Sequence, residues 1–342
     1  MPVRLFALAA VLFLTPLGGL FTPAQLEGSL VGRQVFPVDN WWNIDVSRAP
    51  IDPGSGAFVS FISGRSASNP TAVRRLHPDF GPPPYGIPYV VVSGDQPLVP
   101  VTFVDYGDES DAGAPGRPSG YPVPPEAATQ PDYIEGDVPG GGTSGDRHML
   151  VVDADNWLLF ETYATHWNGS LGRWEAGSGA AFNLSRNDRR PDGWTSADAA
   201  GLAIFPGLVR HDEAFASSEI THAFRVTVRA TNGYVWPASH SAGSTAGAPP
   251  MGTRLRLKAT KNLSAYTPEV QRIFRAMQRY GLIVADNGSD MYITGTMDSR
   301  WDNSVLNPAF ASLTADDFDV VQLGWKGAAP EAPKNLHIIR QP

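Results

Sequence analysis

Short runs of apolar and β-branched residues recur along the chain, and clusters of Gly, Pro, Asn and Asp separate them. The clearest pair of runs spans residues 149–152 and 157–163, on either side of the turn residues 153–156. This pattern predicts a β-hairpin. Because both runs are apolar at successive positions, we expect both faces of the hairpin to be buried in the centre of a packed sheet.

Two more pairs of runs predict hairpins, one formed by 88–92 and 98–104 and one formed by 282–285 and 291–294. Each pair is separated by a cluster of Ser, Gly, Asp or Asn, which are the residues that turns favour. The other predicted strands are 180–184, 222–228, 234–237 and 254–258.

One segment has the period of a helix, with apolar residues at helical spacing from Val270 to Tyr280. Thr267 and Pro268 suit the cap and the first turn, and Gly281 suits the end. Strand patterns outnumber this helical one. The sequence therefore predicts a mostly β fold, namely a β-sandwich or jelly roll with a few peripheral helices.

The N-terminal segment has the layout of a secretory signal peptide. Arg4 precedes the apolar run 5–14, and the small residues Thr22 and Ala24 stand where a signal peptidase would read them. The apolar run is too short for a membrane anchor, because crossing the hydrocarbon core takes about 20 apolar residues.

We therefore expect residues 1–24 to be removed and residues 25–326 to form a single β-rich domain, either catalytic or binding. Residues 327–342 are rich in Pro and Ala and are expected to form a loose C-terminal tail. The mature protein is expected to be secreted, outside the cell or in a periplasm, and not to associate with membrane.

Composition and charge narrow the function classes. The chain has 35 Gly and 31 Pro, which suits short strands joined by tight turns. It has no cysteine, which excludes disulfides, thiolate metal sites and a cysteine nucleophile. The formal net charge of −8 argues against nucleic acid as a partner. No GxSxG, HExxH, P-loop or Rossmann glycine motif is present.

Several strings occur together in this chain: GDRHMLVVD, GWTSADAAGLAIFPGLVR, YVWPASH, PPMGTRLRLK and YGLIVADNGS. In these strings the chain resembles a group of exported bacterial proteins. The resemblance covers most of the chain after residue 24. It implies export and a single fold, and it assigns no role to any residue.

The central hairpin carries the strongest candidate for acid–base chemistry. His148 enters its first strand and Glu161 lies in its second. Burying a carboxylate and an imidazole among apolar residues is costly unless they are paired or catalytic. The two could act as general acid and base, with Asp146 or Glu135 as a second carboxylate for glycoside hydrolysis. The alternative is a structural contact of each with an arginine or the backbone.

A polysaccharide lyase would use the same region differently. It would need a base such as His148, Tyr163 or Tyr234, and a cation such as Arg147 or Arg225 to neutralise a uronate.

A third interpretation is a metal-dependent, cupin-like enzyme. His148, Glu161, His222 and His240 lie in strand-like contexts and could converge on a transition metal. Carboxylates from Asp286 to Asp302 could instead hold Ca²⁺ in a loop, although no EF-hand pattern is present. The acid–base interpretation requires no cofactor.

Aromatic residues among polar neighbours suit stacking on sugar rings, although large aromatics also fill the ends of sandwiches. With Arg147, the predicted substrate-binding residues are Trp167, Trp236, Tyr234 and Trp301. The sequence thus favours an exported carbohydrate-active enzyme, a glycoside hydrolase or polysaccharide lyase, with a polysaccharide or oligosaccharide as partner. The alternatives are a non-catalytic carbohydrate-binding or envelope protein and the metal enzyme.

Overall fold

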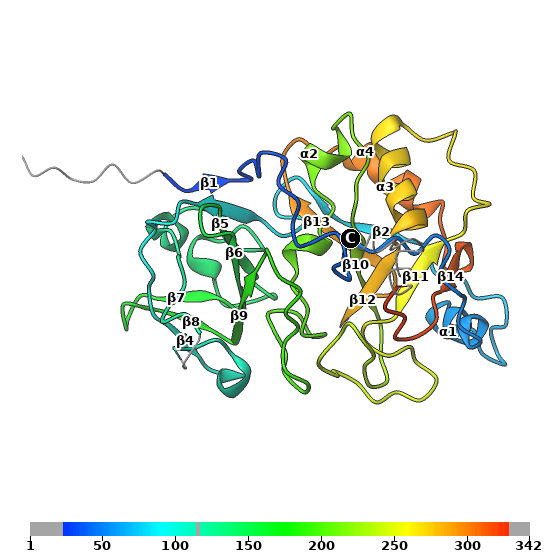
Figure 1. The fold of residues 1–342 in the computed structure, drawn as a ribbon, viewed down its shortest axis with the longest axis horizontal. Coiled ribbons are helices and arrows are strands. Elements are labelled where there is room, and N and C mark those ends of the chain that lie inside the picture. Colours follow the sequence, from blue (N-terminus) through cyan, green and yellow to red (C-terminus); the bar gives the residue numbers. More distant parts are fainter. Residues whose placement is uncertain (1–22, 114–116, 328–342) are drawn as a thin grey trace, which may run out of the picture.

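The computed structural model describes residues 23–113 and 117–327 (Figure 1). In this part of the chain three sheets of five, six and three strands are accompanied by four α-helices, and no sheet closes into a barrel. The prediction of more strand than helix is confirmed.

The five-stranded sheet contains the predicted central hairpin. Its order is β1-β3-β5-β6-β9. The bounds are β1 Gln25–Leu26, β3 Tyr89–Val92, β5 Met149–Asp153, β6 Leu158–Tyr163 and β9 Ser178–Asn183. The hairpin of β5 and β6 is confirmed, with Leu150 opposite Glu161.

The six-stranded sheet has the order β14-β11-β12-β10-β13-β2. Its strands are β14 Phe318–Val320, β11 Arg254–Leu257, β12 Leu282–Asn287, β10 Phe224–Val228, β13 Tyr292–Met297 and β2 His77–Gly81. The third sheet consists of β4 Val101–Phe103, β8 Arg173–Ala176 and β7 His166–Asn168.

Two predicted hairpins are wrong. β3 pairs with β1 and β5, while β4 pairs with β8 in the small sheet. Likewise β10 lies between β12 and β13, so these two strands are not neighbours. In both cases the runs pair with strands that lie farther away in sequence, which turn chemistry alone does not reveal.

Strand directions are mixed. The pairs β3 with β5, β4 with β8, β10 with β12, and β13 with β2 are parallel, and the others are antiparallel. A jelly roll is built of antiparallel strands, so these sheets differ from that arrangement.

The four helices are α1 Ser55–Ile62, α2 His211–Ala214, α3 Pro268–Arg279 and α4 Asn303–Ala311. The helix predicted from Thr267 and Pro268 is confirmed as α3, which buries Val270, Ile273, Phe274 and Met277. In Figure 1, α3 and α4 lie beside the six-stranded sheet.

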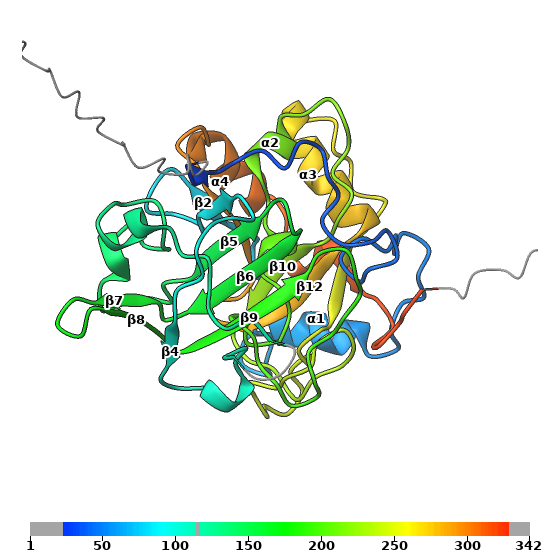
Figure 2. The same ribbon diagram turned by 60° about the vertical axis from the view of Figure 1, so that its left-hand side comes forward.

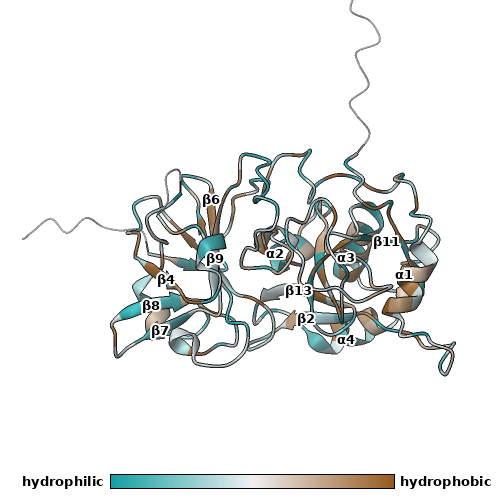
Figure 3. Ribbon diagram, turned by 90° about the horizontal axis from the view of Figure 1, so that it is seen from below, coloured by the Kyte–Doolittle hydropathy of each residue, from teal (hydrophilic) through white to brown (hydrophobic). Residues whose placement is uncertain are grey.

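One hydrophobic core joins the two larger sheets. Tyr89, Leu150 and Leu159 from the five-stranded sheet pack in the same cluster as Phe224 and Ile283 from the six-stranded sheet. Figure 2 shows β6 and β9 in front of β10 and β12. In Figure 3 strand β6 is coloured as hydrophobic, as its central position in the five-stranded sheet requires.

The opposite face of the five-stranded sheet has its own, smaller core. Val90, Val151 and Phe160 pack there with Tyr121 and Trp174. Because successive strand residues point to opposite faces, Leu150 and Glu161 point toward the core between the two sheets. His148 lies two residues before Leu150 and shares this face.

The predicted signal peptide and C-terminal tail fall almost entirely outside the described residues, and they stay predictions together with the single-domain boundaries. Within residues 23–113 and 117–327, no helix has the length and apolar character needed to span a membrane.

Candidate functional site

A cavity of about 250 Å³ is lined by residues from both larger sheets. Asp146 and His148 come from the residues just before β5, Tyr163 from the end of β6, and Asp286 and Asn287 from the end of β12. The segment 195–199 and His240 complete the walls. The cavity is close to the lower end of the range for small-molecule sites, roughly 300–1,000 Å³.

His148, which is buried and lines the cavity, forms a dyad with the partly buried Glu135. The Glu135 carboxylate accepts hydrogen bonds from His148 Nδ1 at 2.7 Å and from the His148 amide at 3.2 Å. The other ring nitrogen, Nε2, lies 3.1 Å from the Ala197 carbonyl oxygen. Burial opposes the charge on the ring, but Glu135 raises the pKa of His148 to about 9. With an acceptor at each nitrogen, His148 is a doubly protonated imidazolium at neutral pH and not a free base.

Arg225 organises a second buried cluster from the middle of β10. Its guanidinium binds both oxygens of Asp198, at 2.9 and 3.0 Å, and donates to Asp286 Oδ2 at 2.8 Å. It also donates to Thr294 Oγ1 at 2.8 Å. Burial raises the pKa of Asp198 to about 6 even though Arg225 favours the carboxylate. Asp286, by contrast, is partly exposed and lies on the cavity wall.

The segment 195–199 is held by hydrogen bonds to its consecutive carbonyl groups. Side chains of distant residues donate to three of them: Ser178 Oγ to Ser196 O at 2.7 Å, His148 Nε2 to Ala197 O at 3.1 Å and His240 Nδ1 to Ala199 O at 2.7 Å. This wall of the cavity is therefore rigid, and its backbone orientation is fixed.

His240 and Tyr163 supply further polar groups. Since a carbonyl only accepts, the Ala199 contact places a proton on His240 Nδ1 and leaves Nε2 as the other ring nitrogen. Tyr163 lies beside His148, with ring centroids 5.7 Å apart. Burial, and then the nearby carboxylate of Asp146, raise the pKa of the Tyr163 hydroxyl.

Glu161 does not reach the cavity, although it was predicted as a catalytic residue. Its side chain is fully buried and accepts hydrogen bonds from the amides of Ile204 and Phe205 at 2.8–2.9 Å. Burial raises its pKa to about 7 against the effect of these amides. Glu161 thus anchors the turn at Phe205–Gly207 to β6, and we leave it out of the proposed site. Asp146, His148 and Glu135 are at the cavity or directly beneath it.

The predicted metal set of His148, Glu161, His222 and His240 is not formed. His222 Nε2 is paired with Glu213 at 2.9 Å, away from this cavity, and Glu161 binds backbone amides. No three His, Asp or Glu side chains in the described parts of the chain lie close enough together to hold a metal ion, which includes the carboxylates from Asp286 to Asp302.

The five predicted substrate-binding residues do not line this cavity. Trp301 is buried and donates its indole N–H to Thr296 O, and Arg147 donates to the carbonyls of Gly145 and Ala164. Trp236 packs edge-on against Trp41. Trp167 and Tyr234 are partly exposed elsewhere, and a role in binding a longer substrate stays a prediction for them.

Sequence reasoning missed Asp198 and Asn287. Asp198 lies between alanines in a segment that resembles an ordinary turn. The signal that could have found it is Arg225, an arginine in the middle of the apolar run FRVTV, which requires a buried carboxylate partner.

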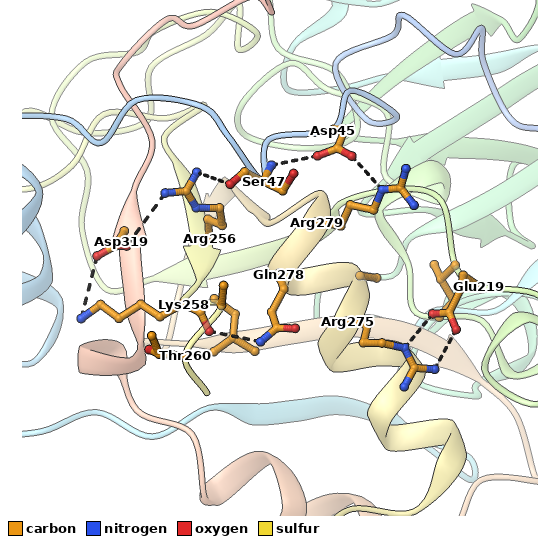
Figure 4. Close-up of a pocket in the computed structure, with 14 residues that line it drawn as sticks. Asp45, Ser47, Glu219, Arg256, Lys258, Thr260, Arg275, Gln278, Arg279 and Asp319 are labelled. Atoms are coloured by element: carbon orange, nitrogen blue, oxygen red, sulfur yellow. Dashed lines mark hydrogen bonds and ion pairs between the residues drawn. The ribbon is translucent and has the colours of Figure 1, made fainter. Parts of the chain in front are cut away.

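A larger cavity, of about 750 Å³, lies elsewhere, between α3, β11 and residues 45–47 (Figure 4). Its charged groups are paired with one another. Arg275 binds Glu219 through two hydrogen bonds, and Arg279 binds Asp45. We call it the α3 groove.

Comparison with known proteins gives no further guide to the site, because no protein-family model, curated protein or solved structure matches the chain. The resemblance to exported bacterial proteins therefore stays a prediction.

Proposed function

We propose that the cavity between the two larger sheets is the active site of an exported carbohydrate-active enzyme that hydrolyses glycosidic bonds. The proposal treats the two sheets as the layers of a sandwich that carries the site at one end. The observation that carries it is that Asp146, from the loop before β5, and Asp286, from β12 of the other sheet, line one small cavity. Glycoside hydrolysis requires two carboxylates on either side of the scissile bond.

The two carboxylates have different surroundings. Asp286 accepts a hydrogen bond from the Arg225 guanidinium at 2.8 Å. No cation in the described residues is paired with Asp146, since the adjacent Arg147 donates to backbone carbonyls. Glycoside hydrolysis needs one carboxyl group that gives a proton and a second that acts as base or nucleophile.

These surroundings assign the roles. Asp146 donates a proton to the glycosidic oxygen as the bond to the anomeric carbon breaks. Asp286 removes a proton from the attacking water, or attacks the anomeric carbon itself, depending on the distance between the two carboxylates. His148 and Arg225 are positioning residues. His148 binds the carbonyl oxygen of Ala197, and Arg225 binds the carboxylate of Asp286.

A hydrolase is favoured over a lyase by the charge of the site. Asp146, Asp198, Asp286 and Glu135 together outnumber the cations His148 and Arg225. An acidic site repels the carboxylate of a uronate, which a lyase must bind and neutralise.

The test is to incubate the purified protein with a panel of polysaccharides and to measure product masses. A hydrolase adds water to the cleaved bond, whereas a lyase leaves an unsaturated product without it. Asp286→Asn should lower turnover by about 10²–10⁴-fold, the range for a lost acid–base group. It should still fold, because Arg225 keeps its two bonds to Asp198.

The matched control is Asp188→Asn, which changes an exposed carboxylate paired with Arg186 and should leave turnover unchanged. Full activity in Asp286→Asn, or no product from any polysaccharide, would remove the proposal.

A further inference from the structure

One wall of the same cavity carries a buried acceptor that no described residue satisfies. The Asn287 Nδ2 group donates to the Ala242 carbonyl at 3.0 Å, and this contact fixes the orientation of the amide because a carbonyl can only accept. The opposite atom, Asn287 Oδ1, is buried and has no hydrogen-bond partner among the described residues. A buried acceptor without a donor is costly, so a ligand that brings an N–H or O–H group is favoured here.

The 195–199 segment provides the complementary donors. Ser196 O and Asp198 O are bound within the protein, the first by Ser178 Oγ at 2.7 Å and the second by the Gly201 amide at 2.9 Å. In a trans peptide the N–H points away from the carbonyl of the same unit, so the amides of Ala197 and Ala199 point away from these contacts. Neither amide has a partner in the described part of the chain, and both alanines line the cavity.

Ala197 is only 5% exposed, and buried amides without a partner are rare in folded proteins. A cavity of about 250 Å³ is roughly 8 Å across, which is the size of one sugar ring with its substituent. The unpartnered acceptor and the two unpartnered donors all belong to residues that line this one cavity.

We propose that the cavity recognises a secondary amide, the acetamido group of an N-acetylated amino sugar. Its N–H donates to Asn287 Oδ1, and its carbonyl oxygen accepts from the amides of Ala197 and Ala199. The inference names the substrate class of the proposed hydrolase and rests on that function for its biological meaning, but the binding step does not depend on turnover.

Other substituents satisfy only part of this set. A free ammonium would pair with Asn287 but would leave the two backbone donors without an acceptor. A carboxylate would satisfy the donors, leave Asn287 Oδ1 unpaired and face the carboxylate of Asp286. An unsubstituted hydroxyl is too short to span both walls at once.

Binding of four monosaccharides, which contain no glycosidic bond to cleave, tests this directly. N-acetylglucosamine, glucosamine, glucose and glucuronate are titrated into the purified protein by calorimetry. We expect N-acetylglucosamine to bind about ten-fold more tightly than each of the others, the value of one hydrogen bond to a buried partner. In protein labelled with ¹⁵N-alanine, the amide signals of Ala197 and Ala199 should shift with this sugar and not with glucose.

Asn287→Leu should abolish the preference, whereas Asn262→Leu, a change of the same kind at an exposed asparagine, should not. Equal binding of all four sugars, tighter binding of glucosamine or glucuronate, or no binding at about 10 mM would overturn the inference. Hydrolysis through Asp286 without a preference for acetamido sugars would leave the proposed function standing. A clear preference without hydrolysis of any glycan would remove the function and keep the binding site.

Discussion

The inter-sheet cavity and the α3 groove both collect charged residues, but they use them in opposite ways. In the groove, Arg275 and Glu219 form an ion pair at the surface, with side chains 39% and 52% exposed. In the cavity, the side chains of Arg225 and Asp198 are only 5% and 0% exposed, and polar groups beside them have no partner. The charged groups of the larger cavity are thus paired with one another, whereas the smaller cavity is lined by polar groups that have no partner among the described residues.

The contrast shows that volume alone does not identify a site. When two exposed charged groups form an ion pair, each gives up contacts with water, so the pair adds little to the free energy of folding. Buried charges have lost their water and depend on fixed partners, so they hold neighbouring groups in a defined geometry. Beside the cavity, the fold thus keeps charged groups buried in fixed positions, and their burial costs free energy of folding.

Removing the buried cation is expected to have the largest effect on stability. Arg225→Leu leaves Asp198 buried without its counterion and Asp286 without its donor. The free energy of unfolding should fall by about 3–5 kcal/mol, the range for a broken buried pair. Chemical denaturation measures this, with Arg275→Leu in the groove as the matched control. If the two variants lost similar free energy of unfolding, the cavity and the groove would not differ in how they use charged residues.

The pH dependence of stability should reveal the His148–Glu135 dyad. The pKa of His148 is raised from 6.5 to about 9 in the folded protein, so its contribution is fully present below pH 6.5 and is lost as the pH rises through about 9. Between these values, Tm of the unmodified protein should fall by an amount on the order of 5 °C that is absent in His148→Gln.

The comparison for this measurement is His166→Gln, because His166 also pairs with a glutamate, Glu175, but with its side chain 31% exposed. Its Tm should follow the unmodified protein across the same pH range. A parallel pH profile in His148→Gln would show that the dyad is not charged in the folded state.

The smallest effect is expected in the groove. Glu219→Gln removes the carboxylate that binds Arg275 by two hydrogen bonds, both on exposed side chains. The free energy of unfolding should change by less than about 1 kcal/mol, and the difference should shrink further when salt is added. If the free energy of unfolding fell as far as in Arg225→Leu, the ion pair in the groove would contribute as much to stability as the buried pair beside the cavity.

Some residues of the site could be predicted from the sequence, because their positions depend on local pattern. The hairpin of residues 149–163 placed His148 at the start of a central strand and Asp146 just before it. Glu161 was recognised as a carboxylate in an apolar strand, but the pattern could not distinguish a catalytic acid from an acceptor for the amides of Ile204 and Phe205, which come 43 and 44 residues later.

The partners of Arg225 illustrate the same limit. Asp198 lies 27 residues before it and Asp286 lies 61 residues after it, so no local spacing joins them. Asp286 meets Arg225 because β12 pairs directly with β10, and Asp198 approaches from the segment between β9 and β10. Sequence reasoning predicted β12 and β13 as a hairpin and did not predict that β10 lies between them.

Local pattern was enough to predict the dominance of strand over helix, the central hairpin, helix α3 and the absence of cysteine chemistry, because periodicity, turn residues and composition act over short distances. The neighbours of each strand, the cation that each buried carboxylate meets and the residues that line the cavity became visible only in the folded chain. These outcomes depend on burial shared between segments far apart in the chain. The buried polar contacts become strong only after folding has removed water from between the two sheets.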